Sequence, residues 1–220
     1  MASFFNLTLD TLAPAGVTIT LDDGALYATS TSVTLKVQTT DGDTSGYQMK
    51  VWGVDGADDE LAANWETFAA EKGITLPTGD GLKTVHVKVR DDVGNESTEA
   101  NASITLNTAV PVVTVTGPDK TKISKVVGFN VSIINFTVDV VFEEYKVCVV
   151  PATASTQDAG TVIGTANGSV NTSGADGGYP ATTNIEVTIN GADLEAASAG
   201  DGVKIVKVFV KNAAGTWSVA

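Results

Sequence analysis

Few side chains in this sequence could act as a nucleophile or a general base. His86 is the one histidine and Cys148 the one cysteine among 220 residues. His86 alternates with Val85 and Val87, which places it on the polar face of a predicted strand. Cys148 falls on the face of its predicted strand opposite Tyr145, and there is no second histidine to activate it. With no Gly-x-Ser-x-Gly motif, phosphate loop or zinc spacing, we expect a solvated histidine, a structural thiol, no cofactor and no enzymatic activity.

Aspartates in predicted turns are better candidates for chemistry, because calcium prefers hard oxygen ligands and can stiffen the junctions of tandem repeats. None of them follows the twelve-residue calcium-loop pattern. Aspartates in turns also commonly serve turn geometry alone, so both interpretations stay open. If calcium binds, it raises the melting temperature. The candidate ligands are Asp22, Asp23, Asp41, Asp43, Asp91 and Asp92.

Aromatic side chains could bind a sugar by stacking against its apolar face. We expect Trp52 and Trp65 to lie in hydrophobic cores, because β-sandwich domains typically bury a tryptophan. Tyr179 stands beside Pro180 at the end of a long polar segment. Tyr179 is therefore the aromatic residue that we expect to contact a ligand or a partner.

Length and composition favour two all-β domains. A chain of 220 residues is long enough for two small β-sandwiches. Val, Thr, Ile, Gly and Ser are abundant, whereas the residues that usually fill helices are sparse. The net charge of -13, without a cluster of Lys and Arg, argues against nucleic acid and anionic membranes as partners. A single cysteine excludes an internal disulfide, so stability must come from packing.

The sequence shows neither a secretory signal nor a membrane span. The N-terminal residues MASFFNLTLD lack the basic region, apolar core and cleavage site of a signal peptide. No later apolar run reaches the length that crosses a bilayer. We therefore expect a soluble chain without membrane insertion.

Two segments of the sequence recur at domain spacing. LTLDTLAP (residues 7–14) returns as ITLNTAVP (residues 104–111). GDGLKTVHVKVRDDVGNES (residues 79–97) returns as GDGVKIVKVFVKNAAGTWS (residues 200–218), with its Gly-Asp-Gly turn and three alternating valines. A repeat of this kind reports the architecture directly, so we expect the same strand and turn to be used once in each domain.

Alternating apolar and polar residues predict short strands in both halves of the chain. Val85, Val87 and Val89 give the clearest alternation and predict a half-buried antiparallel strand. Residues 58–70 and 192–199 carry helical signals, and each segment is either a helix or a connection that covers the core. The other predicted strands cover residues 17–20, 32–37, 47–52, 102–106, 112–116, 131–140, 145–150, 184–189 and 203–210.

The repeat leaves a spare strand at one end of the sequence and a missing strand at the other. Residues 101–106 form the predicted last strand of the first domain, whereas only a short stub follows the matching turn of the second. Residues 5–11 (FNLTLDT) align with residues 102–108 (ASITLNT), so the N-terminus resembles a last strand. An unpaired strand edge invites strand addition.

Two hypotheses explain this pattern. In the first, residues 3–10 complete the second domain of a neighbouring copy or pair with a different assembly protein, through the apolar residues Phe4, Phe5, Leu7 and Leu9. In the second, Phe4 and Phe5 cap their own first domain, and residues 216–219 suffice as a short strand.

The motifs LDTLAP (residues 9–14) and KVRDDVGNES (residues 88–97) resemble the immunoglobulin-like repeats of bacterial surface adhesins and of tailed-phage virion proteins. The resemblance covers both halves, although residues 212–216 depart from the turn motif. It implies an all-β chain of two tandem immunoglobulin-like β-sandwich domains. The expected organisation is an N-terminal arm or strand at 1–10, a first domain at 11–108, and a second domain at 109–220 with a long polar loop at 152–180.

The same resemblance implies a function. It favours a non-enzymatic structural protein of a tailed-phage virion, either a decoration of the head surface or a component of the tail or baseplate. Its partners would be other virion proteins and further copies of itself. The alternative is a carbohydrate- or receptor-binding adhesin module on a bacterial cell surface, with a host-surface glycan as a possible ligand.

Overall fold

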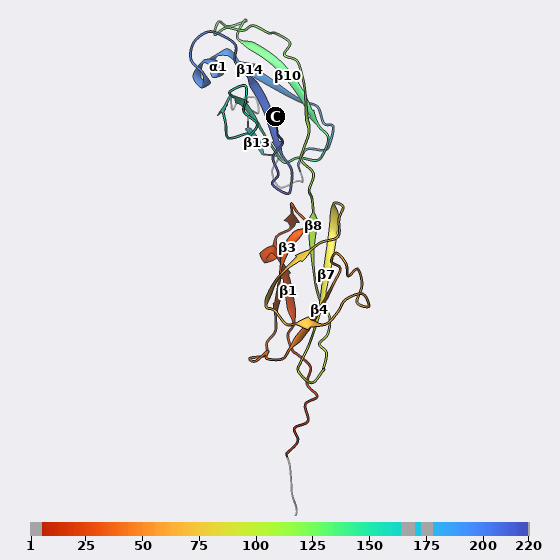
Figure 1. The fold of residues 1–220 in the computed structure, drawn as a ribbon. Helices are drawn as coiled ribbons and strands as arrows, with labels where there is room; N and C mark the ends of the chain where they lie inside the picture. Colours follow the sequence, from red (N-terminus) through yellow and green to blue (C-terminus); the bar gives the residue numbers. More distant parts are fainter. Residues whose placement is uncertain (1–5, 164–169, 173–177, 220) are drawn as a thin grey trace, which may run out of the picture. The chain divides into compact units, whose positions relative to one another are not determined.

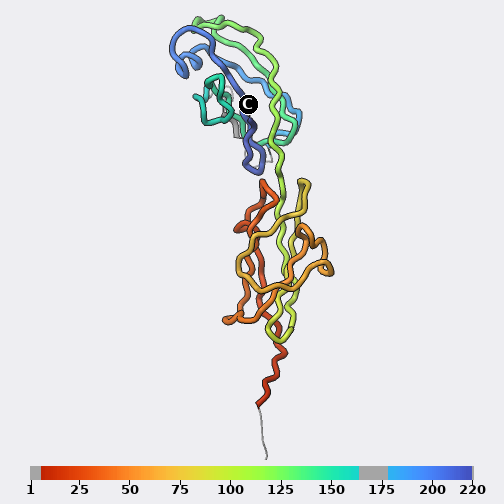
Figure 2. Tube along the Cα trace, viewed as in Figure 1, coloured from red at the N-terminus to blue at the C-terminus, as the bar shows by residue number. Residues whose placement is uncertain are grey.

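The computed structural model describes residues 6–163, 170–172 and 178–219 (Figures 1 and 2). Within these residues the structure is almost entirely β, and its helical elements are the 3-10 turn η1 (Asp22–Gly24) and the helix α1 (Gly191–Ala197). None of the described helices is long and apolar enough to span a bilayer. The chain divides between Thr108 and Ala109 into two compact units, here called the first and the second unit.

Two sheets pack around one core in the first unit. Their core faces follow the predicted alternation, since Val85, Val87 and Val89 are fully buried between polar neighbours. Met49 and Leu35 pack against them in the same cluster. The smaller sheet has the order β1 (Thr18–Leu21), β3 (Ser32–Gln38), β6 (Glu71–Thr75). The larger has the order β2 (Tyr27–Ala28), β8 (Ala100–Leu106), β7 (Gly81–Arg90), β4 (Gln48–Trp52), β5 (Glu66–Thr67).

Strand β8 closes the first unit, as its sequence predicts. It lies antiparallel to β7, with Lys83 opposite Ile104 and Gly81 opposite Leu106. Ile104 and Leu106 are only 1% and 0% exposed, so this strand contributes directly to the core. Its end is held by Asp80, which accepts hydrogen bonds from the backbone nitrogen and hydroxyl of Thr108 at 2.9 and 2.8 Å.

The second unit also has two sheets around one core. Phe136, Val147, Val187 and Val210 are buried between them. One sheet has the order β14 (Ile185–Asn190), β10 (Val131–Val138), β9 (Val113–Thr116). In the other, β11 (Glu144–Val149) pairs with β12 (Thr161–Val162), β13 (Val170–Thr172) and β15 (Val206–Lys211).

Strand β11 is buried on both faces, which the alternation of its residues does not reveal. Tyr145 and Val147 face the main core of the second unit. Cys148 lies on the opposite face, as predicted, in a second small core with Phe209 and Val150. The thiol is therefore a packing group, and it occupies a layer that covers the outer face of this sheet.

The structure decides between the alternatives for two segments and corrects the expectation for Trp65. The segment at 58–70 is not a helix: Asp59 accepts hydrogen bonds from the backbone nitrogens of Leu61 and Ala62 in a turn, and Leu61 is 97% exposed. Trp65 is half-buried and packs under the Arg90 guanidinium. Trp52 is buried as expected, but it stacks on His86 and does not belong to the core cluster of the first unit. The helical alternative for 192–199 is confirmed by α1, which begins one residue earlier.

The remaining predicted strands are all present, with ends shifted by a few residues. The segment predicted as a polar loop at 152–180 contains β12 and β13, and its residues 164–169 and 173–177 lie outside the described part of the chain. Short strands with little apolar alternation, such as β2 and β5, have no periodic signal in the sequence. They form because a longer neighbouring strand offers free backbone groups.

Candidate functional site

The first pair of predicted calcium ligands lies at η1 and is used by neighbouring groups. Asp22 accepts a hydrogen bond from the backbone nitrogen of Thr34 at 2.7 Å. Asp23 forms an ion pair and hydrogen bond with Lys36, and this carboxylate raises the pKa of the Lys36 amine. The two carboxylates thus fasten η1 to strand β3.

The second pair closes the start of the first unit. Asp41 accepts hydrogen bonds at 3.2 Å from the backbone nitrogen of Ala15 and from the Tyr47 hydroxyl. Burial, followed by the charge of Asp41, raises the pKa of the Tyr47 phenol. Asp43 accepts a hydrogen bond from the backbone nitrogen of Ser45 at 2.9 Å, which is turn geometry.

The third pair lies in the turn after β7. Asp91 is buried and accepts hydrogen bonds from the backbone nitrogens of Asn95 and Val93 at 2.8 and 3.1 Å, and from the Asn95 amide at 2.8 Å. Burial raises the pKa of the Asp91 carboxyl, but these hydrogen bonds outweigh it and leave the pKa below its usual value. Asp92 is exposed. No group of three or more His, Cys, Asp or Glu side chains in the described residues is placed to hold a metal ion.

His86 and Cys148 each have a structural environment. The His86 ring stacks on Trp52 with centroids 5.4 Å apart, and its Nδ1 lies 2.7 Å from a Glu99 carboxylate oxygen. The side chain is thus partly covered, where the sequence favoured a solvated one. Cys148 is fully buried, and burial raises the pKa of its thiol, which disfavours the reactive thiolate.

Tyr179, the predicted contact residue, packs within the second unit. Its ring stacks on Phe142 with centroids 4.8 Å apart and meets Tyr145 edge-on at 6.1 Å. Its backbone also pairs with that of Phe142. Tyr179 remains partly exposed, so its ring both supports this core and reaches the surface.

The described part of the N-terminal arm exposes apolar side chains. Leu7 and Leu9 are each 87% exposed, and Leu12, just beyond the arm, is 80% exposed. Figure 2 shows this segment, in red, extending away from the body of its unit. Phe4 and Phe5, the other predicted contact residues, lie outside the described part of the chain.

A mostly apolar groove opens between the two sheets of the second unit. It has a volume of about 410 Å³ and runs between β9 and β15, with residues of β10 and β14 lining it as well. Its polar lining groups include Lys120, Thr121 and Lys204. The apolar lining includes Val115, Ile134, Ile189, Val206 and Val208.

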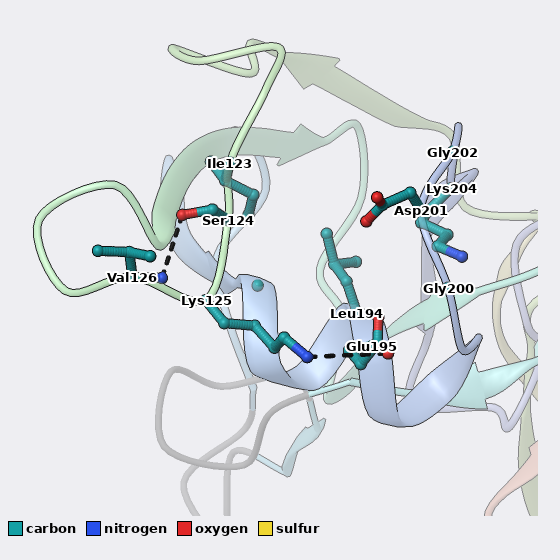
Figure 3. Close-up of a pocket in the computed structure, with 11 residues that line it drawn as sticks. Ile123, Ser124, Lys125, Val126, Leu194, Glu195, Gly200, Asp201, Gly202 and Lys204 are labelled. Atoms are coloured by element: carbon teal, nitrogen blue, oxygen red, sulfur yellow. Dashed lines mark hydrogen bonds and ion pairs between the residues drawn. The ribbon is translucent and has the colours of Figure 1, made fainter.

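A second hollow, of about 390 Å³, adjoins this groove and shares Ile123, Leu194 and Lys204 with it. Figure 3 shows Leu194 rising from α1 toward the turn that carries Asp201. An ion pair of 3.9 Å between Lys125 and Glu195 lies beside it. The groove and the hollow together follow the edge of the second unit from β15 to the Gly-Asp-Gly turn.

The repeat predicted an uncovered strand edge in the second half of the chain, but not which residues line the groove beside it. Ile134, Ile189 and Val208 read as ordinary core positions, because each follows the alternation of its strand. A signal was present in the repeated Gly-Asp-Gly turn, since Asp80 binds the end of β8 in the first unit. The matching Asp201 marks the corresponding place in the second.

No family model matches the chain, and no curated protein matches it. Among solved structures, it is similar to fibronectin(III)-like modules of CbhA from Clostridium thermocellum, at 14% identity over 91% of this chain and 88% of that one, with a TM-score of 0.45. It is also similar to carbohydrate-binding modules from the β-sandwich superfamily, at 14% identity over 95% and 99%, with a TM-score of 0.40. The D00–D0 domain of intimin gives 16% identity over 93% and 95%, with a TM-score of 0.32. Similarities of this size assign neither a family nor a function to the chain.

Proposed function

We propose that this protein is a non-enzymatic structural component of a protein assembly, built from two tandem immunoglobulin-like domains that join their neighbours through exposed strand segments. The observation that carries the proposal is the exposure of Leu7 and Leu9, together with Leu12 beside them. These leucines lie in a run, residues 6–13, in which every residue is exposed.

Burying the leucines of this segment against a partner would be energetically favourable. Fully burying one leucine side chain stabilises a protein or a complex by about 1.5–3 kcal/mol. Two leucines that alternate along an extended chain face the same side, as in a strand that packs on a core. Backbone pairing of an extended segment with a sheet edge adds hydrogen bonds to that apolar contact.

The chemistry of the rest of the molecule agrees with a structural role. The carboxylates of Asp22, Asp41 and Asp91 are engaged in local hydrogen bonds, and the Cys148 thiol is buried. The net charge of -13 favours protein partners over nucleic acid.

The setting we propose is the surface of a tailed-phage particle, which the sequence motifs LDTLAP and KVRDDVGNES support.

Mass spectrometry tests the proposal on virus particles purified from a culture whose DNA encodes this sequence. We expect the protein in many copies per particle, retained through density-gradient purification and released with the structural proteins. Its absence from particles, combined with specific binding of the purified chain to glycans on an array, would replace the proposal with a carbohydrate-binding adhesin module.

A further inference from the structure

We propose that residues 6–11 of one copy add a strand to the second unit of another copy, where they pair with residues 200–205, the segment that leads into β15, and fill the groove beside it. This inference rests on the proposed assembly function and names the partner surface. The two units are closed differently, and this difference supports the inference.

In the first unit, β8 covers the edge of β7. It pairs with β7 from Gly81 to Val87 and packs beside β1. Ile104 and Leu106 point into the core and are almost completely buried. Under this cover the β1 residue Ile19 is 8% exposed.

In the second unit, β15 is the counterpart of β7, because residues 200–218 repeat residues 79–97. Trp217 and Ser218 pair with the end of β15 at Lys211 and Val210. Glu96 and Ser97 make the same bonds to Arg90 and Val89 in the first unit, ahead of β8. Residues 216–219 therefore correspond to the turn that precedes β8, and they do not take its place.

The groove lies where a counterpart of β8 would pack. It is bounded by β9, the first strand of this unit, and by Lys204, Val206 and Val208, which match the β7 residues Lys83, Val85 and Val87. Strand β9, at the edge of its sheet, is poorly covered. Its residue Val115 is 47% exposed, whereas Ile19 of β1 in the first unit is 8% exposed. Apolar walls with an exposed edge strand are the setting for strand addition.

The segment that matches this groove is present in the chain itself. NLTLDT (residues 6–11) aligns with SITLNT (residues 103–108), so Leu7 corresponds to Ile104 and Leu9 to Leu106. The two buried positions of β8 therefore correspond to the two leucines of the arm, each of which is 87% exposed. Transferring the β7–β8 register places Leu7 opposite Lys204, Thr8 opposite Val203 and Leu9 opposite Gly202.

A polar contact fixes the end of the added strand. In the first unit Asp80 accepts two hydrogen bonds from Thr108. Asp201 matches Asp80, is exposed, and lines the hollow that adjoins the groove (Figure 3). Thr11 matches Thr108. The Thr11 hydroxyl and backbone nitrogen of the incoming copy would donate to the Asp201 carboxylate in the same way.

Each copy offers one strand and one groove, so the contact is head-to-tail. A heterologous contact of this kind builds rings when its rotation closes and open rows when it does not. Two copies can also exchange their arms reciprocally and close as a dimer, so association gives a dimer or a larger assembly.

Light scattering of the full-length protein across a concentration series tests the inference first. We expect masses above the 22.5 kDa of one chain that grow with concentration. The double variant Leu7→Asp/Leu9→Asp should remain monomeric, because the charges cannot enter the groove. Leu12→Asp is the matched control: it makes the same change at a residue of similar exposure outside the β8 match, and it should associate like the wild type.

A disulfide experiment tests the register and the partner. Thr8→Cys protein is mixed with Val203→Cys protein and oxidised, so that a cross-link can form only between two chains. We expect a band at twice the chain mass. The control mixture pairs Thr8→Cys with Lys204→Cys, whose side chain faces the other side of the strand, and should give far less product. The native thiol does not interfere, because Cys148 is fully buried.

A monomer at every concentration, or equal cross-linking in the two mixtures, would overturn the inference. Neither result touches the proposed function, which the composition of purified particles tests separately. If the protein is found in particles but the arm does not bind its own second unit, the strand docks on a different particle protein and the self-pairing is wrong.

Discussion

The two units use one strand-and-turn sequence in two ways, and the difference lies in how each unit is closed. In the first, β8 covers the edge of β7 and buries Ile104 and Leu106. In the second, the edge of β15 borders a groove, while the arm that repeats the β8 sequence exposes Leu7 and Leu9. The same apolar alternation therefore forms a buried strand in β8 and an exposed segment in the arm. The difference is that β8 pairs with the edge of a sheet in its own unit.

The outer faces of the two larger sheets differ as well. Lys88 of β7 lies on the polar outer face and forms an ion pair with Glu60 at 2.7 Å. The matching residue of β15 is Phe209, which is fully buried against Cys148 and Val150. The second unit therefore depends on an additional apolar layer that the first does not have at this position.

Replacing Phe209 by alanine should have the largest effect. Removing a buried phenylalanine costs about 3–5 kcal/mol of unfolding free energy, from lost burial and the cavity that remains. Lys88→Ala at the matching position should cost about 0–1 kcal/mol, because an ion pair at a partly exposed surface contributes little. Urea unfolding measures both, with the fluorescence of Trp217 reporting the second unit. Similar costs for the two variants would show that the small second core does not support its sheet.

Replacing equivalent residues of the repeated strand sequence sharpens the main comparison. Ile104→Ala should lower the unfolding free energy of the first unit by about 2–5 kcal/mol. Leu7→Ala, at the matching position of the arm, should change it by less than about 0.5 kcal/mol in dilute solution, because the side chain is exposed. The fluorescence of Trp52 and Trp65 reports this unit in urea titrations. A large cost for Leu7→Ala would mean that the arm folds back onto its own unit.

Much of this architecture could be predicted from the sequence, because its main signal is a period-two alternation. Every long strand appears there, from the three valines of β7 to the buried positions of β10. The failures come from residues whose role depends on tertiary partners. Trp65 was expected in a core, yet it packs under Arg90 at the surface. The apolar residues around Trp65 gave a helical spacing, but Asp59 holds this segment in a turn.

The candidate site could be predicted only in part. The repeat predicted both a segment around Leu7 that resembles β8 and an uncovered edge at β15. The groove itself is formed by residues of four strands, such as Val115 and Ile134, whose proximity depends on the packing of two sheets. The aspartate pairs illustrate the opposite case: their spacing suggested ligands, but each pair includes a carboxylate bound by nearby nitrogens or hydroxyls.

The smallest predicted effect concerns acid, at the turn after β7. Hydrogen bonds from Asn95 and Val93 hold the pKa of Asp91 below its usual value against the opposing effect of burial. A lowered folded pKa contributes stability that is present above the ordinary aspartate value of about 4 and is lost as the pH falls through the folded value. The second unit has Asn212 at this position, where its side-chain oxygen accepts a hydrogen bond from the backbone nitrogen of Thr216 at 2.9 Å. That turn carries no titrating group at the matching site.

Asp91→Asn should therefore remove the contribution of this turn to the pH dependence of stability in the first unit, as in the second unit, where Asn212 occupies the matching position. We expect a modest loss of stability at neutral pH and a smaller further loss on acidification through pH 4 than in the wild type, measured as urea midpoints by tryptophan fluorescence. Asp92→Asn is the control, because that exposed neighbour should leave the slope unchanged. An identical pH slope for wild type and Asp91→Asn would show that the turn is held by its backbone alone, and that the exchange of aspartate for asparagine between the units carries no energetic consequence.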